Sequence, residues 1–157
     1  ILMADLRELF ESLGFDEVKT YIQSGNVVFS SEGQTDIEKV ISAEILSKFG
    51  WEVPVLVRTT LEIENVLNEC LFPKEKMEDS YFTLLKEPPS KKLIGEVNKV
   101  EQANEEFLVT SRCIYFYCAL GYRKVKLNNN WFERKLKVSS TTRNYRTLNK
   151  LLELASN

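Results

Sequence analysis

The sequence contains no histidine among its 157 residues. This absence excludes Ser-His-Asp and Cys-His catalysis and removes the commonest side-chain ligand of transition metals. Only three cysteines occur, Cys70, Cys113 and Cys118, and their odd number and spacing fit neither a disulfide framework nor a zinc site. We interpret them as buried free thiols and predict a cytoplasmic protein, because thiols stay reduced in that compartment. We expect no metal and no cofactor.

Long apolar stretches are also missing. No run of about 18 consecutive apolar residues occurs, which is the length that a membrane-spanning helix requires. We therefore expect no membrane partner. With 43% hydrophobic and 28% charged residues, the composition is typical of an ordinary soluble globular protein.

The net charge of −2 conceals an uneven distribution along the chain. Residues 1–111 contain 11 Lys and Arg against 21 Asp and Glu, whereas residues 112–150 contain 10 basic residues and one acidic residue, Glu133. This asymmetry indicates an anionic partner for the basic segment. The alternative is that the basic segment packs beside the acidic one and is neutralised internally.

Hydrophobic periodicity and turn residues predict alternating helices and strands. In the first part of the chain we expect a helix ending at Gly14, a hairpin over residues 18–30, a helix over 37–49 and a strand over 53–59. In the second part we expect a helix opened by Thr59, a strand over 81–86, a helix capped by Ser90, a hairpin over 106–120 and two C-terminal helices. Thr35 with Glu38, and Thr59 with Glu62, have the spacing of capping boxes.

This order of elements predicts an α+β fold of two subdomains, residues 1–59 and residues 60–157. Each half contains helices and a hairpin, as in variants of the split β-α-β arrangement. A ferredoxin-like unit needs a central strand before the first helix, and the sequence shows no such strand. We therefore expect the first sheet to have a gap or unpaired edges, either because the natural protein has further residues there or because another segment fills the place.

The strongest candidate site is the stretch SSTTRN, residues 139–144, which precedes the last helical pattern. Hydroxyl groups and free backbone N–H groups at a helix start bind phosphate or carboxylate, helped by the helix dipole. We predict an anion-binding surface formed by six residues: Lys126, Thr141, Thr142, Arg143, Asn144 and Lys150. Helical spacing would place Arg143, Arg146 and Lys150 on one face. The alternative is plain capping of the helix by Ser140, Thr141 or Thr142.

Two other patterns have weaker functional content. Residues 131–152 loosely resemble a DNA-binding helix-turn-helix, but the expected apolar positions of the second helix are occupied by Arg143 and Arg146. Ser24, Gly25 and Asn26 form a turn, and no histidine or GxSxG context activates the serine. We interpret this turn as a hairpin tip chosen for its backbone geometry.

Four stretches resemble the bacterial domain of unknown function 1697 family: TYIQSGNVVFSS (residues 20–31), VPVLVRT (53–59), KL-x-N…FERKL (126–136) and TTRNYRTLNKLLEL (141–154). The resemblance implies an α+β protein with two ferredoxin-like subdomains, and it implies no activity, substrate or cofactor. The chain departs from the family pattern in lacking an initial strand with a Gly-rich turn and in having Tyr145 where the family has tryptophan. A Gly-Arg-Ser run ahead of Lys126 and Leu127 is also replaced.

Three functions therefore remain open. The first is a binding module for an anionic ligand, which would be a nucleotide, a phosphorylated metabolite or nucleic acid. The second is a small histidine-free enzyme acting on a phosphorylated substrate, with Lys126, Lys150 or Arg143 stabilising charge. The third is a protein-interaction adaptor whose acidic part meets a basic partner. The sequence favours a binding module over an enzyme, and it leaves the oligomeric state open.

Overall fold

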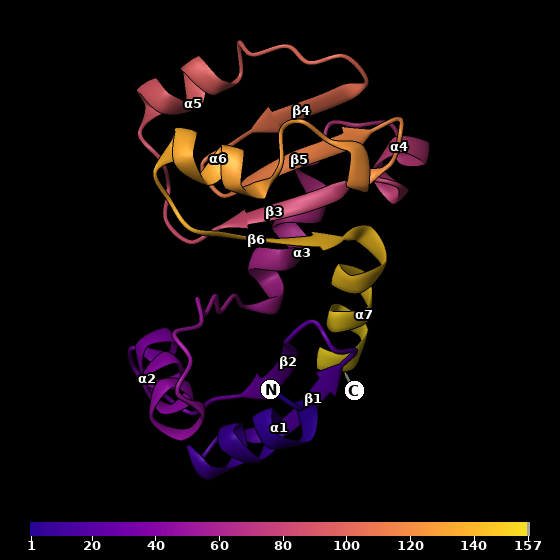
Figure 1. Cartoon of the computed structure of the whole chain (residues 1–157). Coiled ribbons are helices and arrows are strands. Elements are labelled where there is room, and N and C mark those ends of the chain that lie inside the picture. Colours follow the sequence, from indigo (N-terminus) through magenta and orange to yellow (C-terminus); the bar gives the residue numbers. More distant parts are fainter. Residues whose placement is uncertain (157) are drawn as a thin grey trace. The chain divides into compact units, whose positions relative to one another are not determined.

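The computed structural model describes residues 1–156 and contains two compact units (Figure 1). The first unit comprises Ile1–Thr60 and the residues from Asn149 onward, and the second comprises Leu61–Leu148. The C-terminal residues thus group with the first unit instead of the second, and Lys19 Nζ donates a hydrogen bond of 3.0 Å to Leu154 O there. Both units combine helices with antiparallel sheets, which confirms the α+β class. Every described helix is too short or too polar to cross a bilayer.

The first unit is built on one hairpin and two helices. Its elements are α1 (Met3–Ser12), β1 (Asp16–Tyr21), β2 (Asn26–Ser30) and α2 (Ile37–Phe49). The predicted hairpin is confirmed, with Tyr21 opposite Asn26. Asn26 Nδ2 donates to Tyr21 O and to Ser24 Oγ, at 3.2 and 2.9 Å, and Gly25 has a φ of 78°. These bonds give the turn a structural role, because they fix the backbone that reverses the chain.

The core of the first unit lies between the hairpin and the two helices, and it is formed by Leu6, Leu9, Phe10, Phe15, Val18, Ile41 and Ile45. Val53, Val55 and Val57 pack against this core, yet residues 51–59 form no strand, so the strand predicted over 53–59 is wrong. Within the described residues, β1 and β2 pair only with each other. An alternating apolar segment becomes a strand only where another backbone offers it a ladder.

The predicted capping box at the start of α2 is also wrong. The residue before the helix is Asp36, in the left-handed conformation, and its side chain makes no capping bond. The Glu38 carboxylate instead accepts a hydrogen bond of 2.7 Å from Val57 N and lies 3.3 Å from Arg58 Nη1. The carboxylate therefore ties the extended segment to the helix.

The second unit contains a four-stranded antiparallel sheet with the order β4-β5-β3-β6. Its strands are β3 (Tyr81–Leu85), β4 (Glu105–Val109), β5 (Cys113–Cys118) and β6 (Ser140–Asn144). Its helices are α3 (Thr60–Asn68), α4 (Lys74–Glu78), α5 (Lys91–Val97), the 3-10 turn η1 (Tyr122–Lys124), α6 (Asn129–Leu136) and the start of α7 (Tyr145–Ala155). The predicted hairpin over 106–120 and the strand over 81–86 are confirmed, and Ser90 Oγ caps α5 by accepting from Leu93 N.

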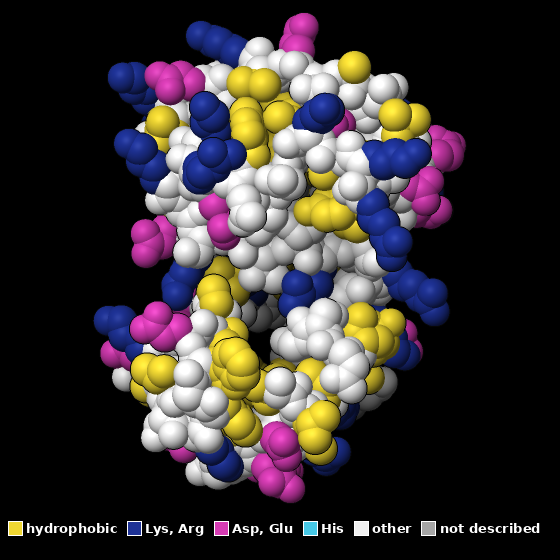
Figure 2. Space-filling view, viewed as in Figure 1, with side chains coloured by type: hydrophobic (Ala, Val, Ile, Leu, Met, Phe, Trp, Pro, Cys, Tyr) yellow, Lys and Arg dark blue, Asp and Glu magenta, His cyan; other side chains and the backbone are white. Residues whose placement is uncertain are grey.

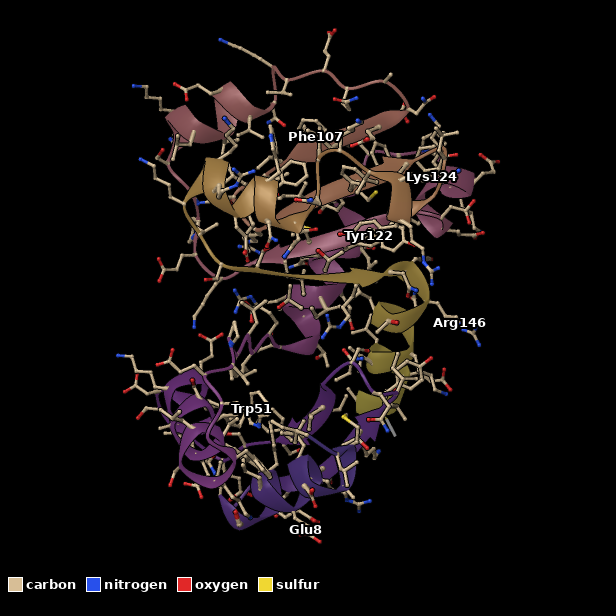
Figure 3. All side chains as sticks on the ribbon, viewed as in Figure 1. Glu8, Trp51, Phe107, Tyr122, Lys124 and Arg146 are labelled. Atoms are coloured by element: carbon tan, nitrogen blue, oxygen red, sulfur yellow. The ribbon has the colours of Figure 1, made fainter. Side chains whose placement is uncertain are left out.

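Alternation along the strands gives this sheet two buried faces. One face packs against α5 and α6 through Leu85, Val97, Val109, Ile114, Phe116, Leu127, Phe132 and Leu136. Phe107 and Tyr122 lie on the same side, with the Tyr122 ring 4.4 Å from that of Tyr81 (Figure 3). The opposite face carries Phe82 and Tyr115, and the Tyr115 hydroxyl donates a hydrogen bond of 2.7 Å to Val66 O in α3.

The prediction that the hydroxyl residues of the stretch 139–144 cap the last helix is wrong. Residues Ser140–Asn144 form the edge strand β6, paired along its whole length with β3. Ser140, Thr141 and Thr142 therefore cap no helix, and a strand stands where a helix-turn-helix would have its turn. The cap of α7 is Asn144, whose Oδ1 accepts a hydrogen bond of 2.8 Å from Thr147 N. The β-branched threonines suit an edge strand. The backbone of β6 also pairs with the backbone groups of β3, which would otherwise lack a partner on that side.

Candidate functional site

The hydroxyl groups of β6 belong to a polar network beneath α6. The Thr142 hydroxyl lies 2.8 Å from that of Thr83 and donates to Asn129 Oδ1, also at 2.8 Å. The Ser140 hydroxyl donates to Asn129 Oδ1 at 3.0 Å and lies 3.1 Å from Glu133 Oε2. Ser140 N donates to the same Glu133 oxygen at 2.6 Å. Glu133 thus supplies a negative charge at the position where the sequence pattern predicted an anion.

The strand also separates the residues that the sequence predicted to act together. Thr142 and Asn144 alternate with Thr141 and Arg143, so the two pairs lie on opposite faces of β6. Arg143 is half-buried, its Nη1 donates a hydrogen bond of 2.9 Å to Thr142 O, and burial lowers the pKa of its guanidinium. Because Arg143 belongs to a strand, its predicted place on one helical face with Arg146 and Lys150 is wrong.

The two predicted lysines lie in different units. Lys126 is exposed in the second unit, just before α6, and its backbone N–H donates a hydrogen bond of 2.8 Å to Glu105 Oε2. Lys150 belongs to the first unit, where its Nζ lies 3.4 Å from Glu153 Oε1. Arg146 and Lys124 extend outward from the ribbon (Figure 3).

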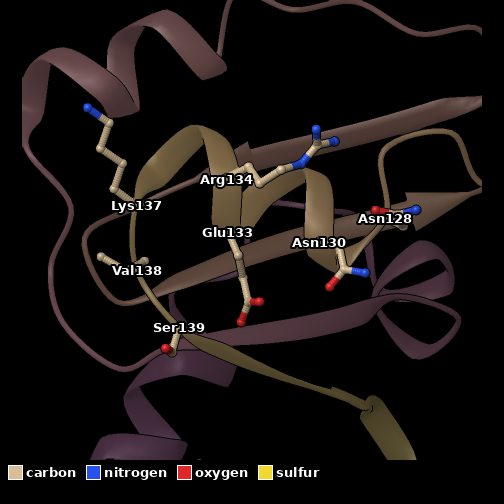
Figure 4. A pocket seen from close by; sticks show the side chains of 7 residues that line it. All are labelled: Asn128, Asn130, Glu133, Arg134, Lys137, Val138 and Ser139. Carbon is tan, nitrogen blue, oxygen red and sulfur yellow. The ribbon is translucent and has the colours of Figure 1, made fainter.

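The structure offers a different polar site on the outer side of α6. A hollow open to solvent is lined there by Asn128, Asn130, Glu133, Arg134, Lys137, Val138 and Ser139 (Figure 4). Asn128 caps the helix by accepting a hydrogen bond of 2.9 Å from Trp131 N. Figure 4 shows Glu133 pointing toward β6, whereas the side chains of Arg134 and Lys137 extend away from that strand. The acidic group is thus turned inward and the two cations face solvent.

We call the exposed residues Asn128, Asn130, Arg134, Lys135 and Lys137 the α6 basic surface. Asn130 and Arg134 are four residues apart in α6, which places their Cβ atoms along one side of the helix. Lys137 follows as the C-terminal cap in the left-handed conformation. Lys135 Nζ lies 5.8 Å from the centre of the Trp131 ring. The sequence analysis missed this surface because it followed the hydroxyl cluster of residues 139–144.

Charge in the second unit segregates between the two helical layers of the sheet. The layer of α5, η1 and α6 contains exposed Lys91, Lys92, Arg123, Lys124, Arg134 and Lys135. The same layer contains one exposed acidic residue, Glu96. On the other face, α3 contains Glu62 and Glu64 and no basic residue, whereas α4 carries Lys74 and Lys76 beside Glu75 and Glu78. Figure 2 shows Lys and Arg side chains gathered over α5 and α6. An anion approaching this unit therefore meets an attractive potential on one face.

The cysteines are poor candidates for a nucleophile. Burial raises the pKa of the thiols of Cys70, Cys113 and Cys118, and Cys113 is fully buried. A raised thiol pKa lowers the fraction of reactive thiolate near neutral pH. Within residues 1–156, no group of three or more carboxylates and thiols is arranged to hold a metal ion.

Comparison with known proteins places the fold and the family. The structure is similar to that of the conserved bacterial protein SP0830 from Streptococcus pneumoniae, with a TM-score of 0.70 and 18% sequence identity, covering 99% of this chain and 89% of the other. No curated protein matches the sequence. Residues 1–115 match the family described as "Protein of unknown function (DUF1697)". That match spans well over half of the chain, and the protein therefore belongs to the DUF1697 family.

Proposed function

We propose that the second unit binds a phosphate-bearing ligand through the α6 basic surface. The observation that carries this proposal is the orientation of charge on α6, where Arg134 and Lys137 line an open hollow and Glu133 turns toward Ser140. Guanidinium groups bind phosphate oxygens in a bidentate manner, and such charge-assisted hydrogen bonds are about twice as strong as neutral ones. The exposed amides of Asn128 and Asn130 add neutral donors.

The residues predicted from the sequence take different parts in this proposal. Lys126 stays in it as an exposed cation two residues before Asn128. Thr142 and Asn144 have structural partners, and Thr141 and Arg143 occupy the other face of β6. Lys150 lies in the first unit and is not included. A histidine-free enzyme and a protein adaptor remain alternatives that no particular contact favours.

Two broader expectations belong to the same proposal. A cytoplasmic location is supported by three cysteines that form no disulfide. A ferredoxin-like origin is supported for the second unit by the order β3, α5, β4, β5, α6, β6 and by the strand order β4-β5-β3-β6. For the first unit it is supported by the hairpin and the two helices that pack around one core.

Nuclear magnetic resonance on the isotope-labelled protein tests the proposed function. Titration with tripolyphosphate at low salt should shift the backbone amide signals of Asn128, Asn130, Arg134 and Lys137 in a saturable manner. The variant Arg134→Gln/Lys137→Gln should lose this saturation. Lys39 and Lys48 are exposed lysines of α2 in the first unit, so Lys39→Gln/Lys48→Gln removes the same charge elsewhere and should bind like the parent. The proposal would be rejected if the amide shifts of the parent never saturate, or if Arg134→Gln/Lys137→Gln shows the same saturable shifts as the parent.

A further inference from the structure

We infer that the ligand of the α6 basic surface is the phosphate backbone of a nucleic-acid duplex, bound without regard to base sequence. This inference rests on the proposed function and names its ligand class. Pockets for small ligands are concave and enclose most of the ligand surface. The hollow beside α6 is open to solvent, and its lining combines two outward cations and two amides with Glu133, which is turned toward β6. Such a surface suits a ligand that is itself long and solvent-exposed.

The dimensions of the surface support a repeating anion. Asn130 and Arg134 are four residues apart in α6, which at about 1.5 Å per residue corresponds to about 6 Å, and Lys137 extends the row at the C-terminal cap. Phosphates along one strand of a duplex recur at about 3.4 Å of helix axis, so this row of donors is long enough to face more than one phosphate. Because α5 packs beside α6, Lys91 and Lys92 extend the cationic area beyond this stripe. One small phosphorylated molecule would leave most of these cations without a contact.

The side chains around α6 favour contacts to the backbone over contacts to bases. Single strands are usually held by exposed aromatic rings on which bases stack. Within residues 61–148, every aromatic side chain is buried or half-buried, and the exposed large apolar residues are Leu61, Leu71, Val100 and Leu120. Trp131 is half-buried and packs against the core beneath α6. Phosphate contacts give affinity without reading sequence, so a duplex is the nucleic acid that this surface fits.

Fluorescence anisotropy at several NaCl concentrations tests the inference. The probes are two DNA duplexes of unrelated sequence, the single strand of one of them, duplexes of decreasing length, and tripolyphosphate as a competitor. We expect both duplexes to bind equally, more tightly than the single strand, and more weakly as they shorten. The logarithm of the binding constant should fall linearly with the logarithm of salt concentration. Arg134→Gln/Lys137→Gln should weaken both duplexes alike and reduce the magnitude of the salt slope by about 2, one for each lost contact.

The controls separate this inference from the function on which it rests. Circular dichroism establishes that each variant is folded, and Lys39→Gln/Lys48→Gln should leave the salt slope unchanged. If tripolyphosphate binds at α6 as tightly as the longest duplex, the ligand is a small phosphorylated molecule, and the duplex inference is wrong while the proposed function stands. Preference for the single strand or for one sequence also overturns it. If neither tripolyphosphate nor any duplex binds, both proposals fall.

Discussion

The first unit contains 6 Lys and Arg against 11 Asp and Glu, and the second contains 15 against 12. Nine of the ten basic residues of the run 112–150 lie in the second unit, where acidic residues of α3, α4 and β4 offset most of their charge. The excess of positive charge survives in the layer of α5, η1 and α6. A block of charge in a sequence thus indicates a functional surface only after the fold has distributed its members over particular faces.

The two units also differ in whether a segment far along the chain joins the sheet. In the second unit, Ser140–Asn144 becomes a strand because β3 presents a free edge along which all five residues pair. In the first unit, residues 53–57 alternate more clearly than β6 does, yet they are held by Glu38 and by the Ser42 hydroxyl, which lies 3.4 Å from Val53 O. A backbone partner, more than side-chain pattern, decides which segment joins a sheet.

The largest expected effect comes from the core of the second unit. Phe82 is fully buried, and its ring contacts those of Tyr115 and Tyr145. Phe82→Ala should lower the free energy of unfolding by about 3–5 kcal/mol, because it removes a large apolar side chain and leaves a cavity. Denaturant unfolding measures the loss, and hydrogen exchange should show that β3 and β5 lose protection first. Leu71, which is 80% exposed, provides the control Leu71→Ala with little change. Earlier loss of protection in β1 and β2 would contradict this assignment.

A smaller loss is expected from the polar network under α6. Thr142→Val keeps the β-branched shape but removes the hydroxyl that lies between Thr83 and Asn129. Polar groups left without partners in a buried setting cost about 1–3 kcal/mol, and Thr142→Ser should restore most of the stability. If the network is instead the ligand site, Thr142→Val would abolish tripolyphosphate binding and leave unfolding unchanged. We expect instead that Thr142→Val lowers the free energy of unfolding and leaves tripolyphosphate binding intact.

The sequence predicted most elements of the fold, but the structure separates the residues of the candidate site that the sequence proposed. The hairpins, β3, α2, α5 and α7 follow from apolar spacing and from local stop signals such as Gly50, which ends α2 in the left-handed conformation. Residues 139–144 and 53–59 were mispredicted because their conformation depends on distant backbone partners. The α6 basic surface was missed because the orientation of Glu133 toward Ser140 is a tertiary contact. Spacing alone cannot show which charges turn inward.

The cysteines provide a probe that is confined to the second unit, since all three lie between residues 61 and 148. Burial, with added effects of Cys70 and Glu69, raises the pKa of the Cys113 thiol well above its ordinary value of about 8.5. As pH rises past about 8.5, the unfolded chain releases this proton while the folded chain retains it. The contribution of Cys113 to stability should therefore be constant below that pH and decline above it. Urea unfolding at a series of pH values measures the decline, and Cys113→Ala should make it less steep, since Cys70 and Cys118 still contribute. An unchanged slope in the variant would reject this origin.

The smallest of these effects concerns the junction between β6 and α7. Asn144 Oδ1 accepts the hydrogen bond from Thr147 N that the sequence pattern had assigned to the preceding hydroxyls. Asn144→Ala should therefore lower stability by about 1 kcal/mol, since it leaves a backbone donor of the first helical turn without a partner. Asn144→Asp keeps an acceptor at the cap and should restore the loss. Thr141→Ala removes a hydroxyl that caps nothing, so it should cost less than Asn144→Ala in the same urea titration. A larger loss for Thr141→Ala would return the capping role to the hydroxyl cluster and would place the helix start earlier than Tyr145.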